Sequence, residues 1–193
     1  MGVKAIVDPL GAEVICICQM TEQQTGPEPA LTLGQAVVTQ GYQEYPDIPV
    51  RCGVGKPAAS VSDWRVSFRQ AGQALQMARR FGEAKPLYFP DLSVYRLLLQ
   101  IEHDPELGAF QEEIIGPLLA YDGSEEFIRT LEAYFKHNAN LSQTAEALFV
   151  HRNTLLYRME RISQILDLDL DIPENRLAVQ LALHIYRMKG SPR

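Results

Sequence analysis

Long apolar runs are missing from this sequence, and its start lacks a charged leader followed by an apolar stretch. A helix needs about 20 consecutive apolar residues to cross a bilayer, and no segment of the chain approaches that length. Both absences argue against a membrane-spanning or secreted protein. We therefore expect a cytoplasmic protein with no membrane partner.

Cysteine is scarce, with Cys16, Cys18 and Cys52 as the whole complement. An odd number of cysteines, without CxxC spacing or a nearby pair of histidines, argues against a disulfide framework and against a zinc site. The acidic run at 167–174 lacks the central glycine and the twelfth-position glutamate of a calcium loop. We expect reduced thiols in the core, no metal and no cofactor.

Catalytic arrangements are also missing. The four histidines do not fall beside a cysteine or serine in any spacing typical of catalysis. The segment GVGKP at 53–57 lacks the spacing of a phosphate-binding loop. Two acids beside a predicted turn, Asp8 and Glu13, are more typical of a solvated surface than of a metal pair. We therefore expect no catalytic residues.

An excess of basic residues is absent, since the net charge of the 193 residues is −6. Residues 83–126 carry two basic and ten acidic groups, whereas residues 127–193 carry nine basic and seven acidic groups. Hydrophobic residues at 46% and charged residues at 22% are typical of a globular chain. The length favours one medium domain and a small one.

The first part of the chain combines strand and helix signals. An unbroken apolar run at 12–20 predicts a strand covered on both faces, in a hairpin that turns at 9–11. A weak helix at 31–45 and a second strand at 48–55 follow.

A stronger helix begins at Ser60, with Asp63 completing a capping box, and ends at Gly82. A short edge strand at 85–92 and two helices between 91 and 119, separated at 103–106, come next. Five apolar residues of the stronger helix are spaced for one buried stripe: Trp64, Phe68, Ala71, Leu75 and Ala78.

A break at Asp122 and Gly123 divides the helical remainder. We place the domain border there, with residues 1–122 as the first domain, including a helical connector from about residue 91, and residues 123–193 as the second.

Residues 141–162, LSQTAEALFVHRNTLLYRMERI, contain a short helical pattern, a turn at 149–151 and a second helical pattern. Asn140 is placed to cap the first helix. The second helix repeats apolar residues at spacings of four, three and four, which predicts a buried face. That face consists of Leu155, Met159, Ile162 and Leu166.

Two short helices at a steep angle fit the major groove of B-DNA, which is about 12 Å wide. Arg152, Asn153 and Thr154 would lie where side chains contact base edges, and neighbouring groups could hold phosphates. The pattern alone leaves open that the arginines only form a solvated helix face. The full predicted DNA-binding set is Ser142, His151, Arg152, Asn153, Thr154, Tyr157, Arg158 and Arg161.

The last helix, from residue 173, carries an apolar stripe of Leu177, Leu181, His184 or Ile185, and Met188. This stripe either covers the DNA-binding unit, which we expect, or pairs with another subunit.

The segment NLSQTAEALFVHRNTLLYRMERISQILDLDLDIPENRLAVQLALHI at 140–185 strongly resembles the terminal helix-turn-helix domain of PucR/CdaR-type regulators. With YRLLL and GPLLAYD, the similarity covers at least residues 85–188. Upstream, VRCGVGKP and SFRQAGQALQMARRFG are similar to that family's GGDEF-like domain, a relative of nucleotide cyclases. The resemblance implies a transcriptional regulator that binds double-stranded DNA. We expect it to act as a homodimer, because one small helix-turn-helix unit rarely binds tightly enough alone.

The chain departs from a working cyclase at the hairpin. Where such an enzyme carries Gly-Gly-Asp-Glu-Phe, this chain has PLGAEV at 9–14, which leaves Glu13 without an acidic neighbour. Metal-assisted phosphoryl chemistry needs clustered carboxylates. We therefore expect no enzymatic activity. The expected fold is α+β, with a partial, degenerate GGDEF-like sheet-and-helix domain followed by an all-α helix-turn-helix domain.

The resemblance also implies that the chain starts partway through the GGDEF-like domain and lacks a sensor domain. We expect a carboxyl-terminal fragment or a short form, with a small-molecule effector bound by a missing upstream domain. A nucleotide-cyclase-like enzyme and a protein-interaction adaptor that does not bind DNA remain the alternatives.

Overall fold

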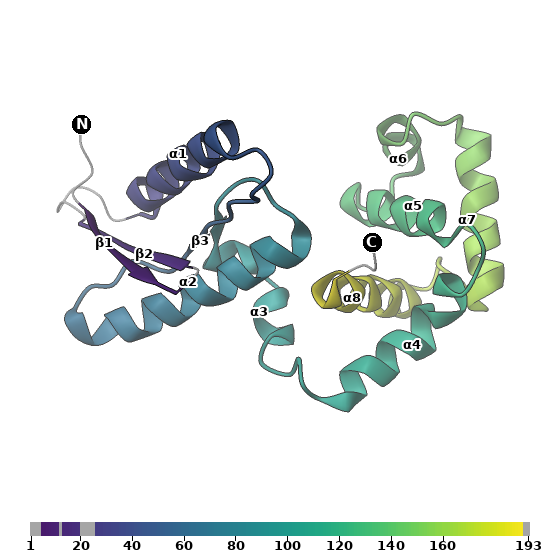
Figure 1. Ribbon diagram of the computed structural model, residues 1–193. Coiled ribbons are helices and arrows are strands. Elements are labelled where there is room, and N and C mark those ends of the chain that lie inside the picture. Colours follow the sequence, from purple (N-terminus) through teal and green to yellow (C-terminus); the bar gives the residue numbers. More distant parts are fainter. Residues whose placement is uncertain (1–4, 12, 20–25, 191–193) are drawn as a thin grey trace. The chain divides into compact units, whose positions relative to one another are not determined.

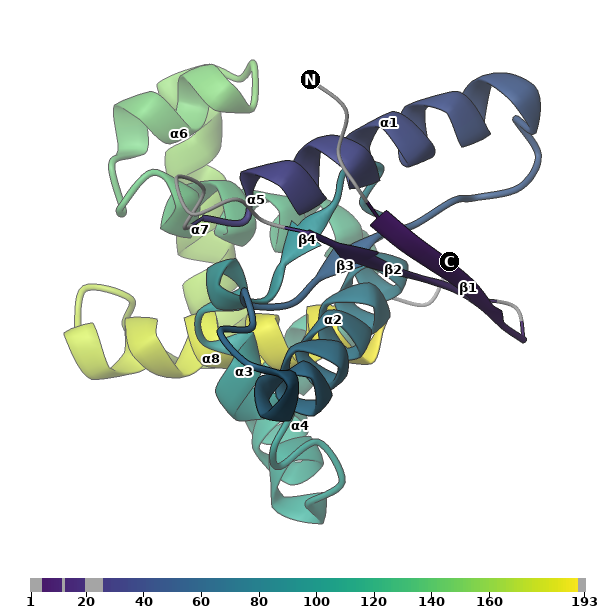
Figure 2. The same cartoon turned by 90° about the vertical axis from the view of Figure 1, so that its left-hand side faces the viewer.

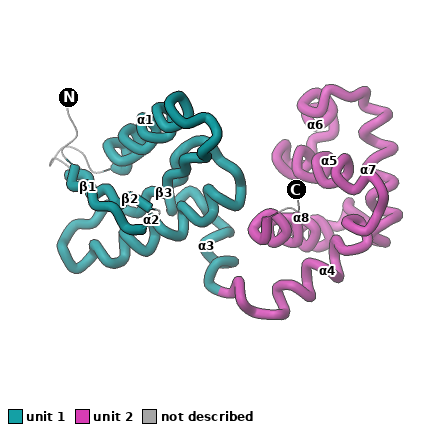
Figure 3. Tube along the Cα trace, viewed as in Figure 1, with its two compact units in different colours: residues 1–100 teal, residues 101–193 magenta. Residues whose placement is uncertain are grey.

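The structure is a computed structural model that describes residues 5–11, 13–19 and 26–190. The chain divides into two compact units, residues 1–100 and residues 101–193 (Figure 3). Strands occur only in the first unit among the described residues, and the second unit is helical (Figure 1). The predicted α+β class is confirmed. No helix in the described ranges combines the length and apolar character that crossing a membrane requires.

The first unit opens with an antiparallel hairpin of β1 (Ala5–Leu10) and β2 (Glu13–Cys18). The hairpin is the predicted one, but its turn lies after Leu10 instead of at 9–11. Pro9 and Leu10 still belong to the ladder, where they oppose Val14 and Glu13. The turn begins at Gly11, whose φ of 63° suits a residue without a Cβ.

The strand predicted at 12–20 was expected to be covered on both faces, and this prediction is wrong for β2. Val14 of β2 is 69% exposed and Ile6 of β1 is 65% exposed. Within the described residues the hairpin pairs only with itself. An apolar run favours a strand, but the layers that cover it must come from other parts of a fold. Ala12 and Met20, the ends of the predicted strand, lie outside the described residues.

The other strands are short and parallel. Helix α1 (Glu28–Glu44) includes residues 31–44 of the predicted weak helix and begins three residues earlier. Of the strand predicted at 48–55, only β3 (Gly53–Val54) is present. It pairs with β4 (Leu87–Tyr88), which lies within the predicted edge strand. Pro86 directly precedes β4 and lacks the N–H that would extend the ladder. Figure 2 shows the strands of this unit between α1 and α2.

Helix α2 (Val61–Phe81) has both predicted ends. The backbone N–H of Ser60 donates to the Asp63 carboxylate at 3.0 Å, which completes the capping box. Gly82 ends the helix in the left-handed region, with a φ of 67°.

The predicted buried stripe of α2 is only partly right. Trp64 and Phe68 are 44% and 50% exposed. The carboxyl-terminal half of α2 packs against β3 and β4, and it buries its own set of side chains. At Gly53 the approach is so close that a Cβ would lie 2.3 Å from the Ala71 carbonyl oxygen. The buried residues of α2 are Ala74, Met77 and Ala78.

The predicted pair of helices between 91 and 119 is present, although its first member is short. The 3-10 helix η1 (Phe89–Leu92) leads to α3 (Tyr95–Leu98), which is a single turn. The second member is α4 (Pro105–Leu119), and the Asp104 carboxylate caps it by accepting from the Glu106 N–H at 3.0 Å.

The three cysteines are free thiols, but the prediction that they lie in the core is not met by all three. Cys16 is exposed, and Cys18 and Cys52 are half-buried. Burial, with a smaller contribution from the adjacent Cys16, raises the pKa of Cys18 to about 11. Cys18 is therefore a protonated thiol at neutral pH.

The second unit packs its helices around one apolar core. Ile115 and Leu118 of α4 are fully buried there, so the segment that the sequence assigns to a connector contributes to this core. Helix α4 contacts three of the other four helices. Those four are α5 (Ser124–Lys136), α6 (Leu141–Ala147), α7 (Arg152–Leu166) and α8 (Pro173–Lys189).

Helix α8 covers the other helices of this unit, as expected, but its predicted stripe is only partly right. Ile185 and Met188 of that stripe are buried, whereas Leu177 is 66% exposed. Val179 and Ala182 are buried as well. Helix α8 packs against α4 and α5. Its apolar residues occupy more than one flank, so the packing partners decide which flank is buried.

Candidate nucleic-acid interface

Helix α6 is fixed at its start by two polar contacts from one residue. The Asn140 side-chain oxygen accepts from the Gln143 N–H at 3.1 Å, which is the predicted cap. The Asn140 carbonyl accepts from the hydroxyl of the buried Thr144 at 2.7 Å. Because α6 has only seven residues, these contacts and its packing must supply the stability that its length does not.

The turn between α6 and α7 lies where the sequence predicts it. The Phe149 N–H donates to the Glu146 carbonyl and the Val150 N–H donates to the Ala145 carbonyl, each at 3.0 Å. His151 then caps α7, because its Nδ1 accepts from the Asn153 N–H at 3.3 Å. The turn is therefore held by main-chain hydrogen bonds on one side and by a side-chain cap on the other.

Helix α7 buries the predicted face. Leu155 and Ile162 are fully buried, and Met159 and Leu166 are nearly so. These side chains join residues of α4, α5, α6 and α8 in the core. Since the buried positions recur every three or four residues, the opposite face of α7 must lie outward.

The predicted contact residues nearest the turn are exposed. Arg152, Asn153 and Thr154 form the outward first turn of α7, and Tyr157, one turn later, is 66% exposed. His151 and Ser142, the latter on the first turn of α6, are exposed as well. The start of α7 also presents backbone N–H groups and the positive end of the helix dipole, which favour an anion.

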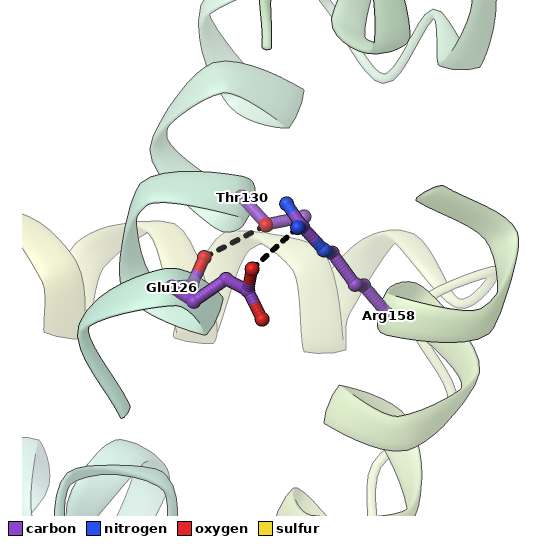
Figure 4. A network of polar contacts seen from close by, with 3 residues as sticks. All are labelled: Glu126, Thr130 and Arg158. Atoms are coloured by element: carbon purple, nitrogen blue, oxygen red, sulfur yellow. Dashed lines mark hydrogen bonds and ion pairs between the residues drawn. The ribbon is translucent and has the colours of Figure 1, made fainter. Parts of the chain in front are cut away.

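Arg158 lies in a different environment, because it is ion-paired with Glu126 of α5 (Figure 4). Its side chain is only 17% exposed. The carbonyl of Glu126 accepts a hydrogen bond from Thr130 at 2.8 Å, within the same helix. This ion pair joins α7 to α5, a role that the sequence analysis did not assign.

Arg161 also contacts the fold. Its guanidinium donates to the Tyr121 hydroxyl at 3.3 Å and to Gln164 at 3.1 Å, and lies 5.5 Å from the centre of the Tyr121 ring. The hydrogen bond to Tyr121 raises the pKa of Arg161. Arg152, in contrast, has no polar side-chain partner among the described residues.

One exposed residue of this region, Phe149, was not predicted from the sequence. Its side chain is 96% exposed, the highest value among the large apolar residues that the structure describes. A signal was present in the sequence, since Phe149 and Val150 are consecutive apolar residues in a short turn. Only one of two such neighbours can pack inward, and Val150 packs against the core.

The two acids of the hairpin in the first unit have different neighbours. Glu13 is ion-paired with Arg79 at 3.0 Å, and Asp8 opposes Ile15. Within the part of the chain that the structure describes, no three histidine, cysteine or acidic residues lie together as metal ligands.

Two domain comparisons identify the parts of the chain. Residues 127–185 match the PucR C-terminal helix-turn-helix domain, and residues 1–77 match the GGDEF-like domain. The chain belongs to the PucR/CdaR-type family. Helices α6 and α7 both lie within the helix-turn-helix match, and the β1–β2 hairpin lies within the GGDEF-like match.

Curated relatives of this PucR-type chain are named as regulators. The proline-responsive transcriptional activator PutR of Bacillus subtilis is 30% identical over 152 residues, which are 77% of this chain and 36% of PutR. The carbohydrate diacid regulator of Escherichia coli is 31% identical over 74% of this chain and 37% of its own length. The purine catabolism regulatory protein of Bacillus subtilis is 27% identical over 72% of this chain and 26% of its own. The chain thus spans about a third of these relatives.

Proposed function

We propose that this chain is the DNA-binding part of a sequence-specific transcriptional regulator of the PucR/CdaR type. The observation that carries the proposal is the exposed first turn of α7, where Arg152, Asn153 and Thr154 lie outward while Leu155 anchors the same turn in the core. A rigid helix end with outward polar groups suits the major groove. The names of the relatives support the same function.

The exposed residues divide by their chemistry. Arg152 and Asn153 have the donor and acceptor groups that form paired hydrogen bonds with guanine and adenine edges. His151, Tyr157 and Ser142 carry single polar groups that suit phosphate or sugar oxygens. Thr154 completes the first turn and contacts either kind of group.

Arg158 and Arg161 keep a place in the proposed interface, although both have partners in the fold. A guanidinium has five N–H donors, and the contacts with Glu126 and Tyr121 use only part of them. We propose that the remaining donors contact phosphates. We expect their removal to weaken binding to all sequences alike, without changing which sequence is preferred.

The regulator would act as a cytoplasmic homodimer. One helix-turn-helix unit contacts few base pairs, and a second copy would double the phosphate contacts and set a half-site spacing of about 10 base pairs or a multiple. A small-molecule effector would bind a domain outside these 193 residues, since the aligned parts of the first two relatives are only 36% and 37% of their lengths.

The test is a set of mobility shifts with the purified chain. Duplexes are first selected from a randomised pool, and affinities for selected and unrelated duplexes are then measured at two salt concentrations. Arg152→Ala and Asn153→Ala should each lose about 10-fold in discrimination between the two duplexes. Arg161→Ala should weaken binding to both, with a shallower salt dependence.

Arg129→Ala is the matched control, because it removes the same charge from an exposed position of α5. We expect it to retain the discrimination of the original chain. Equal affinity for every duplex, with no influence of salt, would contradict the proposal and favour a protein-interaction adaptor.

A further inference from the structure

Phe149 combines two features that a turn residue normally avoids. It is 96% exposed, and its φ is 55°, in the left-handed region. Glycine is expected there because it has no Cβ, or asparagine because its short polar side chain can hydrogen-bond locally. The fold gains no apolar burial from the ring. The ring of Phe149 is therefore accessible to a partner outside the unit.

The main chain holds this ring in a defined place. The N–H groups of Phe149 and Val150 bond to the last turn of α6, and the flanking Leu148 and Val150 pack against the core. The ring therefore extends outward from an anchored turn, the one between α6 and α7 in Figure 1. It is presented three residues before Arg152, next to the cap formed by His151.

The surroundings of Phe149 decide the kind of partner. Its exposed neighbours in the chain are Glu146, Ala147, His151 and Arg152, so the ring is the one large apolar group that is exposed in this stretch of the chain. A protein-docking surface would present several large apolar residues together. The major groove matches the observed arrangement, since its base edges are polar except for the methyl group of thymine.

We propose that Phe149 packs against a thymine methyl group at the edge of the DNA site and thereby makes the protein prefer thymine at one position. This inference rests on the proposed function and adds one specific contact to it. Arg152 and Asn153 would supply the hydrogen bonds, and Phe149 would supply an apolar contact beside them.

The experiment is a double-mutant cycle that measures DNA affinity and combines Phe149→Gly with the replacement of one thymine by deoxyuracil. Sequences are selected from a randomised pool with the 193-residue chain, and the invariant thymine positions of the selected duplex are replaced one by one by deoxyuracil, which removes only the methyl group. At one position we expect about a fivefold loss of affinity for the original chain and none for Phe149→Gly. Phe149→Gly should bind the thymine duplex about as weakly as the original chain binds the deoxyuracil duplex.

The variants keep the fold, because glycine and asparagine both adopt a positive φ readily. Thermal unfolding should therefore show Phe149→Gly and Phe149→Asn to be at least as stable as the original chain. If Phe149→Gly binds the thymine duplex as tightly as the original chain, or if deoxyuracil weakens both proteins equally at every position, the proposed contact is overturned. In either case the original chain still prefers its selected duplex, so the proposed function stands. If the original chain selects no sequence at all, both proposals fail.

Discussion

Leu155 and Leu156 are neighbours of the same type in α7 with opposite environments. Leu155 is fully buried and Leu156 is 37% exposed. Leu155→Ala removes buried methyl groups and leaves a cavity, so it should lower the free energy of unfolding by about 2–5 kcal/mol. Leu156→Ala should lower it by less than about 1 kcal/mol. Urea unfolding followed by circular dichroism measures both values, and similar losses would contradict the buried face assigned to α7.

His184 gives the fold a pH dependence. It is half-buried in α8, and burial, followed by the nearby charge of Arg187, lowers the pKa of its imidazole. The unfolded chain therefore binds the additional proton more readily than the folded chain does. The contribution of His184 to the free energy of unfolding is complete above the ordinary histidine pKa of about 6.5, and it is lost as the pH falls below that value.

The measurement is the unfolding free energy between about pH 7.5 and pH 5.5, a window above the ordinary carboxylate pKa values. We expect His184→Gln to show a smaller fall in stability over this window than the original chain. His103→Gln, at a side chain that is 96% exposed, is the matched control and should keep the original slope. Identical slopes for all three proteins would refute the assignment to His184.

At the scale of the element, α6 depends on its cap. Asn140→Ala removes the acceptor for the Gln143 N–H and should lower the free energy of unfolding by about 1 kcal/mol. Asn140→Asp keeps an acceptor at the same place and should retain most of that stability. Gln143→Ala is the control, because its main-chain N–H stays in place. Equal losses for Asn140→Ala and Gln143→Ala in urea unfolding would rule out the cap as the cause.

The elements were predictable from sequence where local rules decide them. The capping box at Ser60 and the cap at Asn140 are contacts within a few residues of the chain, and the four buried residues of α7 follow a local periodicity. The buried stripes of α2 and α8 were predicted less well. Trp64 and Leu177 have helical spacing but face outward, because β3 and α4 pack against other flanks of these helices.

At the scale of the whole molecule, the limits of the DNA-binding domain can be tested. Ile115 and Leu118 of α4 are fully buried in the core of the second unit. Burying an aliphatic side chain contributes about 1.5–3 kcal/mol, so the two together are comparable to the net stability of a small domain, about 5 kcal/mol. We expect the fragment 101–193 to unfold cooperatively in urea, and the fragment 123–193, which lacks α4, to be far less stable.

The comparison of the two fragments is made by circular dichroism and urea titration under the same conditions. If both fragments have the same unfolding midpoint, α4 is a connector, as the domain border at Gly123 predicts. A cooperative transition in the longer fragment alone would extend the domain to include α4.

The sequence by itself determined the order of the helices, the turn between α6 and α7, the face of α7 that is buried and the family to which the chain belongs. These features depend on periodicity, caps and motifs, which act over short distances along the chain. Only the tertiary structure decided that Arg158 and Arg161 have partners in Glu126 and Tyr121, which lie 32 and 40 residues away. Only the tertiary structure showed that Phe149 is left outside the core. The physical reason is that helical spacing gives the direction of a side chain, whereas the residues that meet it are brought there by the packing of distant segments.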